Sequence, residues 1–371
     1  MPEDGRLQVV FVEHTGQPGG GQLGIERYFG AKSRHERRIV FLESGPVSQR
    51  LSEVAARVET LGSPTGKWLG LLRTPKLFVH LRRAEGDVIV ANSMKAATAL
   101  AFSPRGGGVR VLYLRDDLNR ERLSKFRWWF LVRVVASRFD AYMTNSAWTA
   151  STLPDELRSR PVRVAYPVSG TTSVGATQDS KMLDLRILSL SRIAEWKGTH
   201  VLVEALRILD ERGVVFTATI AGTPLFESKR FHRDVQRAAS TIRSDVQFVG
   251  HVDNVQELLH THNVLVSCTI TPEPFGQVIV QGMSSGLAVV ATKIGGPIEI
   301  TEGGLSGMLV EPNNPRELAD ALELLGTVVP LRERLVDAGL RRAAEFSDER
   351  TVAGLDDAIS EIYAAVMRVR R

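Results

Sequence analysis

Hydrophobic and polar positions alternate between two patterns along this 371-residue chain. Short apolar runs typical of buried strands are separated by longer stretches in which apolar residues recur at helical spacing. The runs are residues 8–12, 38–42, 87–91, 109–114, 141–144, 185–190, 216–221, 246–249, 264–268, 288–291 and 308–310. This alternation predicts the α/β fold class, with parallel sheets that carry helices on both faces.

One stretch interrupts the alternation near the middle of the chain. Residues 169–180, SGTTSVGATQDS, are rich in Ser, Thr and Gly and contain almost no large apolar side chain, which is typical of a linker. The length of the chain also favours two domains. We therefore predict two Rossmann-like doubly wound domains, residues 1–170 and 181–346. Residues 347–371 read as a single helix, because Ser347 can cap it and acidic residues occupy its first turn.

Charge is distributed unevenly between the two halves. The net charge is +5, but residues 1–168 hold 26 Lys and Arg against 16 Asp and Glu, and the rest holds 21 against 26. We expect the two domains to face different partners. The opening, MPEDGRLQ, is polar and predicts no signal peptide, and no apolar run reaches the roughly 18 residues of a membrane span. These features predict a cytoplasmic protein, either soluble or peripheral.

The only cysteine, Cys268, excludes an intrachain disulfide and a cysteine-rich metal site. It ends the apolar run 264–268, so we interpret it as a buried structural thiol rather than a nucleophile. No cluster with metal-ligand spacing is evident elsewhere, and we expect no cofactor or metal.

Two motifs of the second half suit a phosphorylated, polyhydroxylated ligand. Residues 191–198, SRIAEWKG, lie between a strand and a helix, so Arg192 and Lys197 bring two positive charges to a strand end. Residues 271–276, TPEPFG, precede another helix, where Glu273 can accept hydrogen bonds from hydroxyl groups and Gly276 allows close backbone approach. Helix N-termini of this kind favour phosphate. In isolation, solvated cations and a helix-stabilising carboxylate explain each motif as well.

A third motif follows the first predicted strand. The loop 18–22, PGGGQ, contains Gly19 and Gly20 and can lie against a phosphate or a sugar. It matches neither the dinucleotide fingerprint nor a Walker A sequence, so a flexible turn remains an equal interpretation.

Together these motifs resemble the family 4 retaining glycosyltransferases, which have the GT-B fold. The resemblance spans nearly the whole chain. Its matching residues are Pro18-Gly19-Gly20, Ser191-Arg192, Lys197-Gly198, Phe248-Val249-Gly250-His251-Val252, Glu273-Pro274-Phe275-Gly276, Gly286, residues 295–299 (GGPIE) and residues 307–312 (GMLVEP). The resemblance implies that the two domains face a central cleft, with the first binding the acceptor and the second the nucleotide-sugar. It also implies that the C-terminal helix crosses back towards the first domain.

The resemblance also implies roles for individual residues. Arg192 and Lys197 would bind the diphosphate, and Glu273 the donor sugar. The remaining donor-binding positions would be Gly19, Gly20, Gly250, His251, Val252, Pro274, Phe275 and Gly276.

Two positions depart from the family pattern. Gln281 stands where the family has a second acid that contacts the ribose; its amide can still accept and donate hydrogen bonds but carries no charge. Arg115-Asp116 stands where many relatives have His-Asp. Arg115 could bind phosphate or pair with Asp116 or Asp117, and a structural ion pair explains it equally well.

The expected activity is transfer of a sugar from a nucleotide-diphosphate sugar to a hydroxyl of a glycan, a glycolipid or a small metabolite. The resemblance implies retention of configuration and no metal, with the departing diphosphate helping to deprotonate the acceptor. The alternatives are a catalytically impaired nucleotide-sugar-binding protein and another enzyme class on this fold, such as an epimerase.

Two basic stretches of the first half also carry aromatic and aliphatic residues. They are residues 120–138, RERLSKFRWWFLVRVVASR, and residues 67–76, KWLGLLRTPK. Either can lie on an anionic membrane surface, or the apolar residues can be core with the cations reaching out to water. No motif supports nucleic-acid binding.

Overall fold

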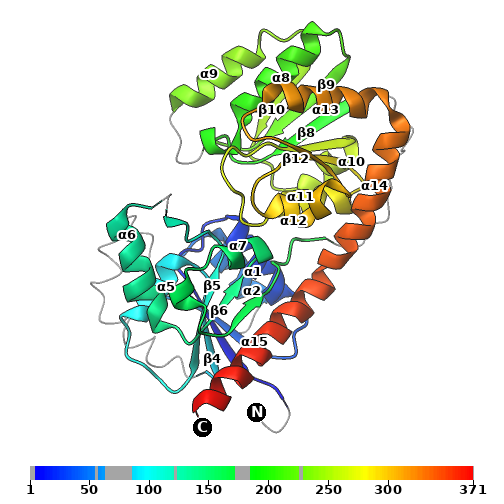
Figure 1. The fold of residues 1–371 in the computed structure, drawn as a ribbon. Coiled ribbons are helices and arrows are strands. Elements are labelled where there is room, and N and C mark those ends of the chain that lie inside the picture. The colour runs from blue at the N-terminus through cyan, green and yellow to red at the C-terminus, as the bar shows by residue number, and fades with distance from the viewer. Residues whose placement is uncertain are drawn as a thin grey trace. The chain divides into compact units, whose positions relative to one another are not determined.

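The computed structural model describes residues 5–54, 57–62, 86–120, 123–171, 184–224 and 229–370. The chain divides into two compact units (Figure 1). Unit 1 comprises Met1–Gly170 and Asp348–Arg371, and unit 2 comprises Thr171–Ser347. The basic stretch 67–76 and linker residues 172–180 lie outside the described residues.

Unit 1 is built on a seven-stranded parallel sheet with the order β3-β2-β1-β4-β5-β6-β7. Its strands are β1 (Gln8–Glu13), β2 (Glu36–Phe41), β3 (Val58–Thr60), β4 (Val88–Ala91), β5 (Val109–Leu114), β6 (Ala141–Thr144) and β7 (Val162–Val164). All residues of β4, β5 and β6 are buried, as expected for strands covered on both faces.

Helices cover both faces of this sheet. On one face, α1 (Gly20–Gly30), α2 (Pro46–Val54) and α15 (Asp348–Arg370) share one hydrophobic core with the strands. On the other, α5 (Met94–Ala101) and residues 130–139 contribute to a second core, against which Trp128 packs. The short helices α6 (Lys125–Trp129) and α7 (Ala147–Ser151) also belong to unit 1.

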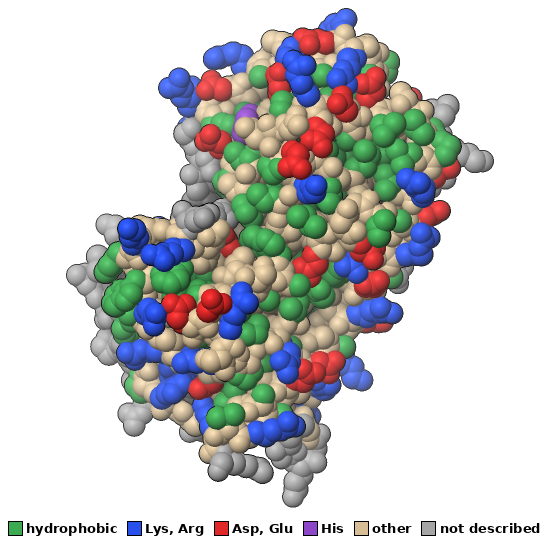
Figure 2. All heavy atoms as spheres, in the orientation of Figure 1, with side chains coloured by type: hydrophobic (Ala, Val, Ile, Leu, Met, Phe, Trp, Pro, Cys, Tyr) green, Lys and Arg blue, Asp and Glu red, His purple; other side chains and the backbone are tan. Residues whose placement is uncertain are grey.

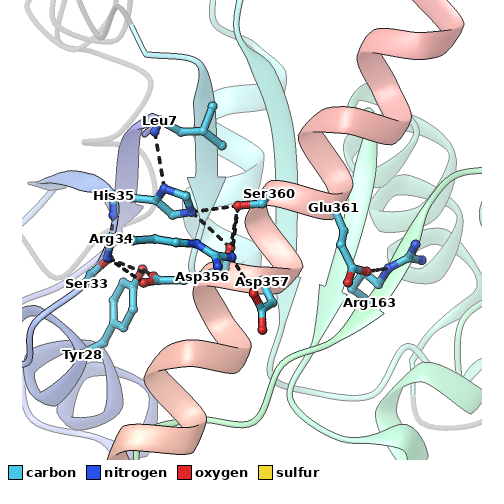
Figure 3. Close-up of polar contacts among 10 residues, drawn as sticks. All are labelled: Leu7, Tyr28, Ser33, Arg34, His35, Arg163, Asp356, Asp357, Ser360 and Glu361. Carbon is cyan, nitrogen blue, oxygen red and sulfur yellow. Dashed lines mark hydrogen bonds and ion pairs between the residues drawn. The ribbon is translucent and has the colours of Figure 1, made fainter. Parts of the chain in front are cut away.

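The last helix, α15, is fastened to unit 1 by a buried carboxylate (Figure 3). Asp356 accepts hydrogen bonds from the Tyr28 hydroxyl at 2.5 Å, from Ser33 Oγ at 2.9 Å and from the Arg34 backbone N–H at 3.0 Å. His35 adds a second link, because its Nδ1 accepts from Leu7 N and its Nε2 lies 3.1 Å from the Asp356 carbonyl oxygen. Burial and the Asp356 charge raise the pKa of Tyr28, which keeps this phenol a donor.

Unit 2 repeats the architecture with a six-stranded parallel sheet, in the order β10-β9-β8-β11-β12-β13. Its strands are β8 (Leu185–Leu190), β9 (Phe216–Ala221), β10 (Asp245–Gly250), β11 (Val264–Ser267), β12 (Ala288–Thr292) and β13 (Met308–Val310). Its helices are α8 (Thr199–Glu211), α9 (Lys229–Ala239), α10 (Val255–Thr261), α11 (Gln277–Ser284), α12 (Gly296–Ile300), α13 (Pro315–Thr327) and α14 (Val329–Ala343).

The helices of unit 2 also lie on both faces of its sheet. One face of the sheet packs with α8, α9 and α13 in a single core that includes Val264 and Val266. Leu265 points to the opposite face and meets α11, where a Cβ on Gly282 would lie 2.7 Å from its side chain. The predicted α/β fold class with two doubly wound, Rossmann-like units is confirmed.

The predicted strands correspond to strands of the structure within two residues at each end. Two strands were not predicted, β3 and β7, which are three residues long, only partly buried and at the two edges of the unit 1 sheet. Helix α1 begins at Gly20, inside the predicted glycine loop 18–22. Among the described residues, no helix combines the length and apolar character needed to cross a membrane.

Candidate active site

The predicted site residues of unit 2 meet at the carboxyl edge of its sheet. Strands β8, β11 and β12 are neighbours in the sheet, so the loops that follow them emerge side by side. These loops contain, in order, Lys197, Glu273 and Gly295. Ligands of open parallel α/β sheets bind at this edge.

An ion pair between Lys197 and Glu273 joins the first two loops. The Lys197 ammonium donates to Glu273 Oε2, and the two side chains are 14% and 19% exposed. A pair this sheltered is screened less by salt than a surface pair. Its remaining exposure leaves both groups within reach of a ligand.

The Trp196 ring orients both cations of the first loop. Lys197 Nζ lies 4.2 Å from the ring centroid, and the Arg192 guanidinium carbon lies 5.1 Å from it. Cation–π contacts of this kind contribute about 0.5–1 kcal/mol at exposed sites. Arg192 is exposed, so the guanidinium group that stacks on the ring is accessible to solvent.

Glycine makes the close approach of these loops possible. At Gly198, φ is +71°, and a Cβ would lie 1.9 Å from the Cys268 carbonyl oxygen. At Gly295, φ is +80°, and a Cβ would lie 2.4 Å from the Glu273 carbonyl oxygen. The backbone of Glu273 is fixed from the same side, because Gly296 N–H donates to its carbonyl at 2.7 Å.

Cys268 is a buried part of this scaffold. Its thiol donates to the Gly198 carbonyl oxygen at 3.3 Å. Burial raises the pKa of the thiol to about 12, so it stays protonated at neutral pH. The interpretation of Cys268 as a structural thiol agrees with this environment.

Helix α11 follows the Glu273 loop directly. Its N-cap, Gly276, has φ +106° and supplies no capping side chain, so the first-turn N–H groups are not covered by one. Pro274 is half-buried and Phe275 is buried, with its ring 5.8 Å from that of Phe346. Gln281 is half-buried on α11, and its backbone carbonyl oxygen accepts from Ser284 Oγ at 2.9 Å.

The loop after β10 approaches the Arg192 loop through Gly222. Gly222 N–H donates to the Gly250 carbonyl oxygen at 2.7 Å, and a Cβ on Gly222 would lie 1.8 Å from the Ser191 carbonyl oxygen. His251 and Val252 come next along this edge, and His251 Nε2 lies 3.2 Å from exposed Asp253. Sequence reasoning did not identify Gly222 as a site residue, although a Gly directly after a buried strand was a usable signal.

In unit 1 the predicted residues also lie at a carboxyl edge. Gly19 is the N-cap of α1 and Gly20 its first residue. The Arg115 guanidinium carbon lies 4.5 Å from the Tyr113 ring centroid, and its Nε donates to Asn92 Oδ1 at 3.0 Å. Asp116 is exposed.

A cluster around Glu13 and His14 in unit 1 was not predicted as a site. Buried Glu13, at the end of β1, contacts His14 and also accepts from Asn92 Nδ2 at 2.6 Å. A charged residue that ends a buried strand could have indicated it. Within the described residues, no three His, Cys, Asp or Glu side chains are grouped as a metal site.

Comparison with known proteins shows what this part of the chain is similar to. Residues 184–327, which contain the unit 2 site, match the family model "Glycosyl transferases group 1". The chain is 27% identical over 290 residues to the lipopolysaccharide core biosynthesis glycosyltransferase LpsE of Rhizobium meliloti, covering 76% of this chain and 77% of LpsE. It is 27% identical over 255 residues to a D-inositol 3-phosphate glycosyltransferase of Salinispora arenicola, covering 62% of this chain and 57% of that enzyme.

The fold is similar to that of Anabaena HepE, solved in complex with UDP-glucose. The TM-score is 0.80 at 23% identity, covering 96% of this chain and all of HepE. The fold is therefore GT-B, with two doubly wound units. Over residues 184–327, which make up less than half of the chain, the sequence is similar to the group 1 glycosyltransferases.

Proposed function

We propose that this protein transfers a sugar from a nucleotide-diphosphate sugar to a hydroxyl of an acceptor, with unit 2 holding the donor. The observation that carries the proposal is the convergence of Lys197, Glu273 and Arg192 at one strand edge, beside the N-terminus of α11. A diphosphate needs the cations and N–H groups, and a sugar needs the carboxylate as hydrogen-bond acceptor.

In the proposed reaction the bond between the anomeric carbon and the diphosphate oxygen breaks. The acceptor oxygen bonds to the same face of that carbon, so configuration is retained, and the acceptor proton passes to the departing diphosphate. Arg192, Lys197 and the N-terminus of α11 would offset the charge that grows on the leaving group. Because three sources of positive potential already face it, we propose that transfer proceeds without a metal.

For the remaining residues we propose the roles that the family resemblance implies. Glu273 accepts from donor-sugar hydroxyls while Lys197 turns to the phosphate. His251 and Val252 lie beside the base, and Gln281 contacts the ribose. Since HepE was solved with UDP-glucose, uridine diphosphate sugars are the first donors to test.

The proposal is tested with a thermal-shift panel of nucleoside diphosphates and nucleotide-sugars. A ligand that binds only the folded state at a hundred times its Kd stabilises it by about 2.7 kcal/mol. We expect at least one nucleotide-sugar to raise the unfolding temperature and to be hydrolysed slowly without an acceptor. Stabilisation without turnover for any acceptor would instead favour a binding protein, the alternative that Gln281 and Arg115 raise. If no nucleotide stabilises the protein, the donor assignment fails.

We further propose that unit 1 rests on an anionic membrane when it meets a lipid-linked acceptor. Phe126 and Trp129 of α6 are 72% and 49% exposed, and their rings lie 6.0 Å apart. Exposed Lys125 and Arg127 flank them. Figure 2 shows blue cationic and green hydrophobic side chains together on the side where Figure 1 places α6. Apolar side chains ringed by cations suit an anionic lipid surface.

A further inference from the structure

A buried carboxylate holds a histidine at the point where the strand order of unit 1 reverses. From β1 the chain runs to β2 and β3 on one side, whereas β4 pairs with the other side of β1. Glu13 ends β1, and Asn92 and Ser93 follow β4. The cluster therefore lies at the topological switch point, outside the carboxyl ends of the strands, where α/β sheets bind their ligands.

The hydrogen bonds of Glu13 converge on its neighbour. Glu13 has no exposed surface, and its Oε1 accepts from both the backbone N–H and the ring Nδ1 of His14 at 2.6 Å. Its Oε2 accepts from Asn92 Nδ2 at 2.6 Å. Burial alone would raise the pKa of Glu13, but the hydrogen bonds from His14 and Asn92 hold the pKa below its ordinary value.

This arrangement fixes the tautomer of the ring. An ionised carboxylate can only accept, so the proton of neutral His14 lies on Nδ1, where Ser93 Oγ at 2.9 Å provides a second contact. Nε2 is then a lone-pair acceptor. The side chain is 20% exposed, and among the described residues Nε2 makes no hydrogen bond.

The same network extends to Arg115. Asn92 donates to Glu13 through Nδ2 and accepts from Arg115 Nε through Oδ1. Each polar atom of the Asn92 side chain therefore has a partner, which holds Glu13 in place from the side opposite His14. A buried charge costs several kcal/mol unless it is satisfied, and here that charge secures the orientation of one half-buried imidazole.

We propose that His14, oriented by Glu13, binds the acceptor by taking a hydrogen bond from an acceptor hydroxyl at Nε2. The inference rests on the proposed function and adds the ligand class of unit 1: a sugar or polyol that presents a hydroxyl donor. His14 acts by positioning the hydroxyl, and the proton still leaves with the diphosphate.

The ring tautomer provides a test that needs no acceptor. Long-range proton–nitrogen NMR of the histidine rings, assigned with His14→Gln, should show that the neutral form of His14 carries its proton on Nδ1 and none on Nε2. Glu13→Gln should allow the other tautomer to appear, because its amide can also donate. A wild-type ring protonated on Nε2 would overturn the proposal.

The second test separates acceptor from donor. Using UDP-glucose and a set of methyl glycosides, inositols and glycerol, we expect His14→Ala to lower sugar transfer roughly tenfold, the contribution of one hydrogen bond. Donor hydrolysis by water and the donor-induced thermal shift should stay unchanged. His14→Gln, whose amide oxygen can accept near the Nε2 position, should recover part of the transfer rate, and exposed His260→Ala serves as the matched control.

Equal loss of transfer, hydrolysis and donor stabilisation in His14→Ala would mean that Glu13 and His14 only stabilise the fold, which would contradict the proposal. Unchanged transfer would contradict it as well. Failure of the donor assignment looks different, because the wild type itself would then show neither nucleotide stabilisation nor hydrolysis.

Discussion

Lys197 and Glu273 lie 76 positions apart in the chain, and each is the nearest counter-charge of the other at the strand edge of unit 2. The pairing explains how the free protein keeps both groups ready: each satisfies the other until a ligand offers phosphate to one and hydroxyls to the other. The glycines at 198 and 295 are the structural requirement for this, because a Cβ at either position would collide with backbone.

Removing the ammonium tests the charge that we assign to the leaving group. We expect Lys197→Ala to lower kcat/KM for sugar transfer by about a hundredfold, near 3 kcal/mol in the barrier, as for loss of one preorganised donor. Lys229→Ala, which removes an exposed lysine at the start of α9, is the control and should leave the rate unchanged. If Lys197→Ala and Arg192→Ala both turned over like the wild type, the diphosphate assignment would be wrong.

Motif spacing allowed the placement of Arg192, Lys197 and Glu273 at one sheet edge to be predicted, because all three follow strands of one sheet. Arg115 shows where such prediction ends. The structure gives Arg115 two contacts that the sequence did not indicate, with Asn92 and with the Tyr113 ring. Asn92 lies on the adjacent strand end 23 residues away, and strand order across a sheet is not evident from a single sequence.

Helix α15 shows how one buried group can secure a whole element. Asp356 satisfies three donors from α1 and the loop after it, whereas its neighbour Asp357 is 58% exposed and pairs with Arg34 at the surface. Two adjacent carboxylates of one helix therefore differ in what they contribute to stability.

We expect Asp356→Ala to lower the free energy of unfolding of unit 1 by about 3 kcal/mol, because buried donors lose their acceptor. Asp357→Ala should cost less than about 1 kcal/mol, the usual limit for an exposed pair. Denaturant unfolding followed by tryptophan fluorescence measures both, since four of the five Trp residues belong to unit 1. Similar losses in the two variants would contradict the anchoring role of Asp356.

The environment of His262, which follows α10, leads us to expect that the stability of unit 2 depends on pH. Burial lowers the pKa of its imidazole, with Nδ1 2.7 Å from the Leu258 carbonyl oxygen and Nε2 2.8 Å from Thr219 Oγ1. The unfolded chain therefore binds a proton at higher pH than the folded one. Stability from this group is complete above the ordinary histidine pKa and is lost as pH falls through about 6.5 towards the lowered value.

Replacing the ring should weaken that dependence. We expect His262→Gln to reduce the loss of unfolding free energy between pH 7 and pH 5, measured by denaturant titration with Trp196 fluorescence as the unit 2 probe. Part of the loss should remain, because burial also lowers the pKa of His200. His260→Gln, at an exposed position of the preceding helix, should leave the pH profile unchanged, and an unchanged profile in His262→Gln would refute the assignment.

Secondary structure followed from the sequence wherever strands were buried on both faces. Strands β5 and β6, whose residues are all buried, have the predicted bounds. Strands β8 and β9 also have them, although polar residues interrupt their apolar positions. Strands β3 and β7 could not be recognised in the same way, since short, partly buried edge strands carry too few apolar residues for a pattern.

The excess of positive charge in the first half of the chain lies partly on the surface of unit 1. Its cations surround exposed aromatic side chains on α6, while unit 2 is mildly acidic. Attraction to anionic lipids contributes about 1 kcal/mol for each Lys or Arg near the surface and is screened by salt. The difference in net charge between the two units would then turn unit 1, rather than unit 2, towards an anionic membrane.

We expect the protein to sediment with phosphatidylglycerol vesicles at low salt and much less at high salt or with purely zwitterionic vesicles. Replacing Phe126 and Trp129 by Ala should weaken binding, because their apolar area no longer enters the lipid. A double variant of the exposed apolar residues Val215 and Leu305 in unit 2 is the matched control. Equal binding by both double variants would place the contact elsewhere.

The position of α15 in the chain has a consequence for how the protein is made. Its residues Leu355, Ile359 and Ile362 complete a core with β1 and α1 of unit 1, yet they follow all of unit 2 in the sequence. During synthesis, the part of this sheet face that α15 covers must stay exposed while the whole of unit 2 is translated. Unit 2 is continuous in sequence and can fold first, so the unit that is synthesised earlier is completed later, and its exposed apolar surface is prone to aggregation until α15 arrives.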